Sequence, residues 1–151
     1  MINEDGSIQD RTTRGDRALW YHNSALAEIM VSMEYARAVN LTIPYTLETK
    51  LHKAVTLFLD GLDDHSIFAN WAKERHNSKY DGMTQDWRDD WIESGNMYTG
   101  WLFMYPYYYP NHENTKRLRL RVPMHSTSAN RDIDYGFGLG CLYNATAVAR
   151  G

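Results

Sequence analysis

Residues 16–39 read DRALWYHNSALAEIMVSMEYARAV and indicate the fold class more strongly than any other stretch of the chain. Their apolar side chains recur every three or four positions, at Leu19, Leu26, Ile29, Met30, Met33 and Ala36. This spacing places them on one face of a helix, which we expect from about residue 16 to residue 39 with Asp16 as its N-cap. The following segment, 40–44, ends in a proline and breaks the helix.

The same period continues downstream and predicts further helices. It is carried next by Leu47, Leu51, Ala54, Val55 and Phe58. We therefore expect a second helix over about 46–60, with Gly61 as its C-terminal stop. Asp63 or Asp64 would cap a short third helix that carries Ile67, Phe68 and Trp71.

Later segments are less regular. Trp87, Trp91 and Ile92 share one face of a fourth segment, and Tyr98, Trp101, Leu102 and Tyr105 would form a fifth. We expect Pro106 to stop that helix. Residues 117–122 alternate between arginine and an apolar residue, which predicts a strand ended by Pro123. Gly136, Gly138 and Gly140 then predict an irregular or extended tail.

Length and composition limit the number of domains, the fold class and the kinds of partner. The chain has 151 residues, 43% of them apolar, which fits one domain over 1–151 of mainly α class. Within it we expect a polar loop or arm at 1–15, helices over 16–110 and a less regular stretch at 111–151. The net charge of −3 gives no whole-molecule attraction to nucleic acid or membranes. No apolar run reaches the roughly 20 residues that span a bilayer, and we expect no membrane partner.

Two further features concern the compartment. Cys141 is the only cysteine, which excludes an internal disulfide framework. The first residues lack the basic and apolar regions of a signal peptide. The sequence as given therefore leaves the compartment open.

Polar side chains of chemical interest gather at the start of the first predicted helix. They are Arg14, Arg17, Tyr21, His22, Asn23 and Ser24. Arg17, Tyr21 and Ser24 are spaced i, i+4 and i+7, so they share one helix face. Such a face offers a group that binds a carboxylate and a phenol that transfers a proton. In the alternative, purely structural interpretation, Arg17 stacks on Tyr21 and His22 faces solvent.

An aromatic run and a cationic run follow. The segment 101–110 belongs to a chain with eleven tyrosines, and aromatic faces of this kind stack on sugar rings. We expect Trp101 toward the core and Tyr107–Tyr109 toward the surface, with a buried helix end as the alternative. Lys116–Arg121 places four cations within six residues, which suits a polyanion partner or a solvated edge.

Other motifs are weaker. His-x-Ser/Thr occurs at His22, His76 and His125, a pattern that two-histidine phosphoesterases place on strands, whereas the first copy here lies in a predicted helix. No histidine or carboxylate spacing indicates a metal, and no glycine loop has the spacing that holds a phosphate. We expect no metal and no cofactor.

The motif Arg17-Ala18-Leu19-x-Tyr21-His22-Asn23-x-Ala25-Leu26 resembles one found in the alginate (polymannuronate) lyases, an all-helical polysaccharide lyase family. Other similar segments follow the family's order: Asp5-Gly6, Gly61–Asp64 with Phe68-Ala69, Met83-Thr84, Trp101-Leu102 with Tyr105, and Phe137–Gly140. The chain resembles the C-terminal portion of that family's toroid. The expected architecture is thus a partial α/α-toroid-like array with an irregular, Gly-rich C-terminal third. A second protein chain or another copy would cover its exposed helix faces.

The resemblance implies β-elimination on a uronate polymer such as alginate. The enzyme neutralises the sugar carboxylate, a base removes the C5 proton, and an acid protonates the departing oxygen. Arg17 matches the family arginine that neutralises the carboxylate. The family's catalytic tyrosine, seven residues later, is replaced here by Ser24, which leaves Tyr21 as the proton-transfer candidate. Tyr21 also stands seven residues after Arg14. An alternative alignment, in which Arg14 and Tyr21 match the family's arginine and tyrosine, therefore stays open.

The remaining predicted site residues surround that pair. His22 joins it as a catalytic candidate and rims the site with Asn23. Arg14, Asn23 and Ser24 are expected to bind substrate, with Trp101, Tyr105 and Arg119 as outer contacts. The substitution at Ser24 keeps open a non-catalytic carbohydrate-binding or virion-type structural protein. The cations of 116–121 and the His-x-Ser/Thr copies keep open a nucleic-acid or nucleotide-processing protein, which a steep salt dependence of binding would favour. The resemblance would place the protein in a periplasm or outside the cell.

Overall fold

The computed structural model of the chain describes residues 1–9, 11, 17–68, 98–121, 131–132, 136–137 and 143. The longer helices in these residues are α1 (Ala18–Ala38), α2 (Tyr45–Asp63), α5 (Trp101–Tyr108) and α6 (Glu113–Arg121). An antiparallel pair of short strands, β1 (Arg131–Asp132) and β2 (Gly136–Phe137), pairs Arg131 with Phe137 and Asp132 with Gly136. The prediction of a mainly helical protein is confirmed.

Helix α1 forms where the sequence predicts it. Arg17 is its N-cap residue and Val39 its C-cap residue. Asn40 follows with a φ of 59°, a left-handed conformation that asparagine tolerates better than most residues, and so ends the helix. The predicted cap, Asp16, lies outside the described residues.

The predicted stop of the second helix at Gly61 is wrong, because α2 continues to Asp63. A Cβ at position 61 would meet the ring of Phe68 and the side chain of Leu19. The glycine is therefore needed for close packing and not for ending the helix. As expected, Asp64 caps the next turn: its Oδ1 accepts the Ser66 N–H at 2.9 Å, and residues 65–68 are helical.

The stop predicted at Pro106 is also wrong. Pro106 lies inside α5, which runs on to Tyr108. A proline inside a helix lacks an N–H donor and its ring crowds the carbonyl four residues back, yet here the last turn still forms, because the Tyr109 N–H reaches the Tyr105 carbonyl at 2.9 Å. Most of the aromatic run thus forms one short helix whose first six residues, 101–106, are buried.

The strand predicted over 117–122 is helix α6. Strand geometry would bury Leu118 and Leu120 on one face, but only Leu118 is buried and Leu120 is 90% exposed. Leucine, lysine and arginine all favour helix over strand, and the alternation arises from composition. The predictions for Trp87, Trp91, Ile92, Pro123, Gly138, Gly140 and Cys141 concern residues outside the described part.

The N-terminal residues dock on α2 as a tight turn. Ile2 pairs with Ile8 across it, and both side chains are buried. Gly6 has a φ of +88° at this turn, which glycine adopts without strain. Lys50 holds Glu4 at 2.7 Å. The segment expected as a polar arm is therefore partly packed against the body of the molecule.

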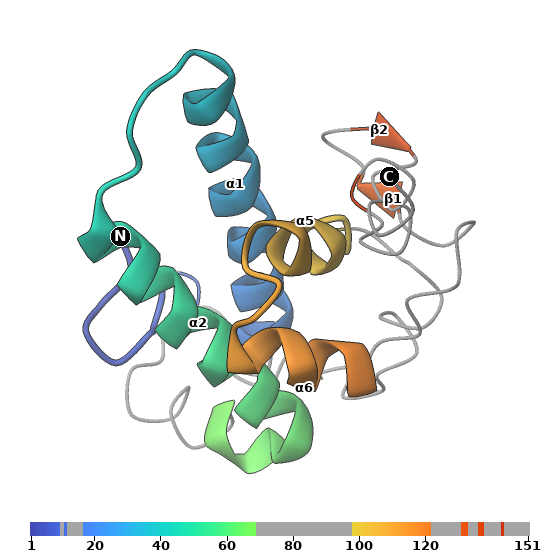
Figure 1. The fold of residues 1–151 in the computed structure, drawn as a ribbon. Coiled ribbons are helices and arrows are strands. Elements are labelled where there is room, and N and C mark those ends of the chain that lie inside the picture. The colour runs from blue at the N-terminus through green and yellow to red at the C-terminus, as the bar shows by residue number, and fades with distance from the viewer. Residues whose placement is uncertain are drawn as a thin grey trace.

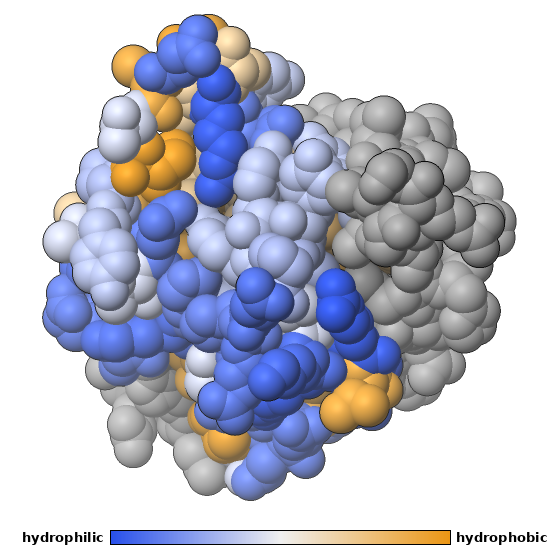
Figure 2. Space-filling view, in the orientation of Figure 1, coloured by the Kyte–Doolittle hydropathy of each residue, from blue (hydrophilic) through white to orange (hydrophobic). Residues whose placement is uncertain are grey.

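The core lies where α1, α2, α5 and α6 meet. Figure 1 shows α5 between α1 and α6, and residue contacts join α1 to α2 and α5, and α6 to α2 and α5. Its largest fully buried side chains include Trp101, Tyr105, Phe58, Phe68 and Leu26. Apolar surface gathers around the end of α1 in Figure 2, where Val39 and Leu41 are exposed. Among the described residues, no helix combines the length and the hydropathy that a membrane crossing requires.

Candidate functional site

The start of α1 presents two of the predicted site residues to solvent. Arg17 is exposed at the N-cap position and Tyr21, one turn later, is half-buried. Residues four apart on a helix are neighbours on its surface. The guanidinium and the phenol therefore lie on one accessible face, while Arg14 lies outside the described residues.

Ser24 lies on the same helix but is turned inward. Its exposed fraction is 5%, compared with a half-buried Tyr21. A hydroxyl at this depth has little access to a polymer in solvent. The expectation that Ser24 shares the accessible face of Arg17 and Tyr21 is therefore wrong, because Ser24 is buried.

His22 belongs to the core. The side chain is fully buried, and its Nε2–H donates to the carbonyl of Ala54 in α2 at 2.8 Å. Burial lowers the pKa of His22 to about 4, so the imidazole is neutral at neutral pH. The interpretation with His22 facing solvent is therefore wrong. A ring so enclosed cannot contact a polymer, and its role is to hold α1 against α2.

Asn23 is buried as well and joins α1 to the start of α5. Its Nδ2 donates to the carbonyl of Tyr98 at 3.2 Å, and its Oδ1 accepts the indole N–H of Trp101 at 2.8 Å. Because an indole nitrogen only donates, the amide must face Trp101 with its oxygen. Asn23 thus holds Trp101 and Tyr98 in place and does not rim a surface.

An aromatic group that the sequence prediction did not include flanks Tyr21. The ring of Trp20 meets that of Tyr21 edge to face at 5.1 Å and that of Tyr98 at 5.5 Å. Tyr98 has a φ of 66°, a conformation that costs a bulky residue about 1–2 kcal/mol. The i+3 spacing of Trp20 from Arg17 was a usable signal in the sequence, but no sequence pattern joins Trp20 to Tyr98.

Trp101 lies in the core, as one of its two predictions had it, and Tyr105 lies there too, so neither is an outer contact. Trp101 packs edge to face on Phe58, and both it and Tyr105 are fully buried. An apolar face of α5 packs against α1, which leaves these rings no solvent side. Tyr107 is exposed, as expected, whereas Tyr108 and Tyr109 are half-buried.

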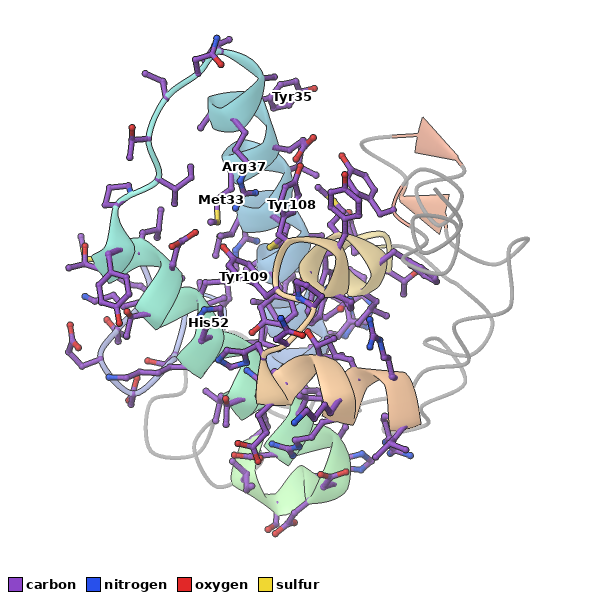
Figure 3. All side chains as sticks on the ribbon, in the orientation of Figure 1. Met33, Tyr35, Arg37, His52, Tyr108 and Tyr109 are labelled. Carbon is purple, nitrogen blue, oxygen red and sulfur yellow. The ribbon has the colours of Figure 1, made fainter. Side chains whose placement is uncertain are left out.

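Tyr108 and Tyr109, labelled with Arg37 in Figure 3, are hydrogen-bonded to carboxylates of α1 and α2. Tyr108 donates to Glu34 of α1, and Tyr109 donates to Glu48 of α2 at 3.0 Å. Arg37 lies over the Tyr108 ring and donates to the Tyr109 hydroxyl at 3.2 Å. Burial, followed by Glu48, raises the pKa of Tyr109 to about 12. The phenols stay protonated and tie α5 to α1 and α2.

A second polar cluster, absent from the sequence prediction, surrounds the Tyr105 hydroxyl. That oxygen lies 2.7 Å from Nδ1 of His52 and 3.1 Å from Nδ1 of His112, whose rings stack at 4.0 Å. Asn114 binds the His52 carbonyl and accepts from Thr56. His52 and Thr56 come from α2, Tyr105 from α5, His112 from the loop after it and Asn114 from α6, so no local spacing in the sequence could have joined the α2 residues to the others.

The arginines of α6 fall into two sets: Arg117 and Arg121 bind α2, whereas Arg119 is exposed. Arg117 binds Asp60 and Asp63, both at 2.8 Å, and Arg121 donates to the carbonyl of Leu62. Arg119 is exposed on the same helix. The carboxylates neutralise part of the run and weaken the case for a phosphate backbone as partner.

In the part of the chain that the structure describes, no three His, Cys, Asp or Glu side chains group as metal ligands do.

Comparison with known proteins agrees with the motif at the start of α1. The family model described as alginate lyase matches residues 1–68. No curated protein and no solved structure matches the chain. The matched range contains Asp5-Gly6, the 17–26 motif and Gly61–Phe68, three of the segments on which the resemblance rests. The predicted resemblance to the alginate lyase family is confirmed over residues 1–68.

Proposed function

We propose that the start of α1 binds a uronate polymer and catalyses β-elimination across its glycosidic bond. The observation that carries this proposal is the pairing of an exposed Arg17 with an accessible Tyr21 one turn later, inside the segment that matches the family. Arg17 would neutralise the sugar carboxylate, which makes the C5 proton removable. Tyr21 would transfer the proton.

The other residues of the stretch have supporting roles in this proposal. His22 and Asn23 fix the helix against α2 and α5, and so hold Arg17 and Tyr21 in register. Ser24 stands where the resemblance places the catalytic tyrosine; it is buried, whereas the half-buried Tyr21 keeps part of its surface in solvent and is the proposed displaced phenol. Arg119 remains as an outer cation for a polyanionic chain, whereas Trp101 and Tyr105 support the site from the core.

The test is the ultraviolet absorbance of unsaturated uronate product on mixing the full chain with polymannuronate, polyguluronate or glucuronan. We expect product from at least one polymer, a rate lowered by about 10²–10³ in Arg17→Ala, and a loss of about 10²–10⁴ in Tyr21→Phe. Tyr35→Phe is the matched control, because Tyr35 is an exposed tyrosine near the other end of the same helix. Wild-type rates in Arg17→Ala would overturn the assignment.

Ser24 supports one alternative, a carbohydrate-binding protein without catalysis. It predicts polymer binding without product, and no product in Ser24→Tyr. Gain of product in that variant would instead identify an enzyme that lost its phenol at position 24.

A further inference from the structure

Tyr98 holds a backbone conformation that its own side chain disfavours. Its φ of 66° lies in the left-handed region, where a bulky residue is a genuine outlier. Such a conformation persists only where the surroundings fix it, and outliers of this kind cluster at ligand sites. The position of the Tyr98 ring is thus determined by its neighbours.

The neighbour that fixes the backbone is Asn23. Its amide nitrogen donates to the Tyr98 carbonyl, while the Trp101 indole holds the amide oxygen. Asn23 and Trp101 are both fully buried, so the bond between them fixes the amide, whose nitrogen then makes the part-buried bond to the Tyr98 carbonyl. The side chain of Asn23 therefore acts as a rigid support under an exposed edge of the molecule.

The ring held in this way faces the proposed site. Tyr98 meets Trp20 edge to face, and Trp20 meets Tyr21 in the same manner. All three rings are half-buried, which leaves each of them part of its surface in solvent. Arg17 lies one helical turn before Trp20 and is exposed.

We propose that Trp20 and Tyr98 form an aromatic platform, in which the face of one ring stacks on a pyranose ring of the polymer and the other ring, at 83° to it, supports it, and that Asn23 is the positioning residue of this platform. The proposal rests on the proposed function in taking the ligand to be a uronate polymer held by Arg17. Aromatic faces suit the C–H face of a pyranose, and the polar edge of tyrosine suits its hydroxyls. The platform supplies affinity for the ring next to the reacting one, and Arg17 supplies recognition of the carboxylate.

The first experiment measures both binding and elimination. A mannuronate oligomer is titrated calorimetrically into the full chain, and product formation is followed on the same preparations. We expect Trp20→Ala and Tyr98→Ala each to weaken binding about tenfold or more, acting through KM with kcat less changed. Trp20→Phe and Tyr98→Phe keep an aromatic face and should bind within a few-fold of wild type. Tyr107→Ala, an exposed ring on α5, is the matched control.

The second experiment separates the positioning role of Asn23 from a general loss of stability. Tyr98→Gly removes the ring and relieves the backbone, because glycine adopts positive φ freely. Asn23→Ala should weaken binding in the wild-type chain and have no further effect on affinity in Tyr98→Gly, although it lowers the melting temperature in both. Equal loss of affinity in the two backgrounds would overturn the positioning role.

The outcomes distinguish this proposal from the proposed function. Oligomer binding that needs Trp20 and Tyr98 but yields no product supports the platform and overturns the lyase activity. Product formation that is unchanged in Trp20→Ala and Tyr98→Ala supports the lyase activity and overturns the platform. A wild-type chain that binds no uronate oligomer overturns both.

Discussion

Two buried polar clusters hold this molecule together, and they are built differently. One lies on α1, where the consecutive residues His22 and Asn23 reach to α2 and α5. The other surrounds the Tyr105 hydroxyl and draws His52 and His112 from separate parts of the chain. The first includes residues next in sequence to the accessible Tyr21, whereas the second joins α2 to α5.

The difference shows in how each histidine is satisfied. His22 donates from Nε2, but its Nδ1 is buried with no hydrogen-bond partner among the described residues. His52 is half-buried, and its Nδ1 lies against the Tyr105 hydroxyl. A buried polar group without a partner costs more than one inside a bonded network. The fold is thus more sensitive to protonation of His22, behind the proposed site, than to protonation of His52.

The largest expected effect concerns acid and His22. Burial holds the pKa of His22 at about 4, below its ordinary value of 6.5, so between these values the unfolded chain binds a proton that the folded chain does not. This contribution to stability is complete above pH 6.5 and is lost as the pH falls toward 4, by about 3 kcal/mol in total. The free energy of unfolding of His22→Leu, measured in urea at several pH values, should lack this slope. An unchanged slope would refute the assignment.

The next effect breaks the second cluster. Tyr105→Phe removes the oxygen shared by His52 and His112 while keeping the ring. Because two half-buried imidazoles lose their partner, we expect a loss of about 1–2 kcal/mol in the free energy of unfolding. Tyr107→Phe is the control, since its ring is exposed, and should change stability by less than about 0.5 kcal/mol. Binding of a uronate oligomer should survive in Tyr105→Phe, which would separate this cluster from the site.

A smaller effect concerns the stacked histidines. Burial, and then the charge of His112, lower the pKa of His52, while Glu48 opposes them. The neutral ring therefore stabilises the fold above the ordinary histidine pKa, and this stability is lost as the pH falls below it. The ring of His52, followed by NMR, should titrate at higher pH in His112→Asn than in wild type. A midpoint that does not move would show that the two rings are not coupled.

The smallest effect lies on the surface and provides a reference for both clusters. Arg117 binds Asp60 and Asp63 with its side chain 31% exposed. Exposed pairs contribute little, so Arg117→Ala should cost about 1 kcal/mol or less, and less still at high salt. Thermal unfolding at two salt concentrations tests this. A loss as large as that of Tyr105→Phe would mean that charge pairing on α6 matters as much as the buried network.

Local sequence patterns predicted part of the fold well. The period of apolar residues in α1 and α2 gave both helices nearly to their ends, because a helix that packs one face on a core must repeat its apolar residues at that period. The same reasoning failed at Gly61 and Pro106, where packing of Phe68 and the last turn of α5 decided the outcome. It failed again in α6. There the alternation of arginine and leucine predicted a strand, but the segment is a helix that buries Leu118 and leaves Leu120 exposed.

The candidate site shows the same division. The order of residues along α1 determined that Arg17 and Tyr21 share a face, since helical spacing is a local property of the chain. Only the tertiary structure decided that His22, Asn23, Trp101 and Tyr105 are buried, because burial depends on which helices pack against that face. Tyr98 reaches Trp20, and His112 reaches His52, across many residues of intervening sequence. Contacts of that kind arise from the packing of distant segments, which no local pattern in the sequence encodes.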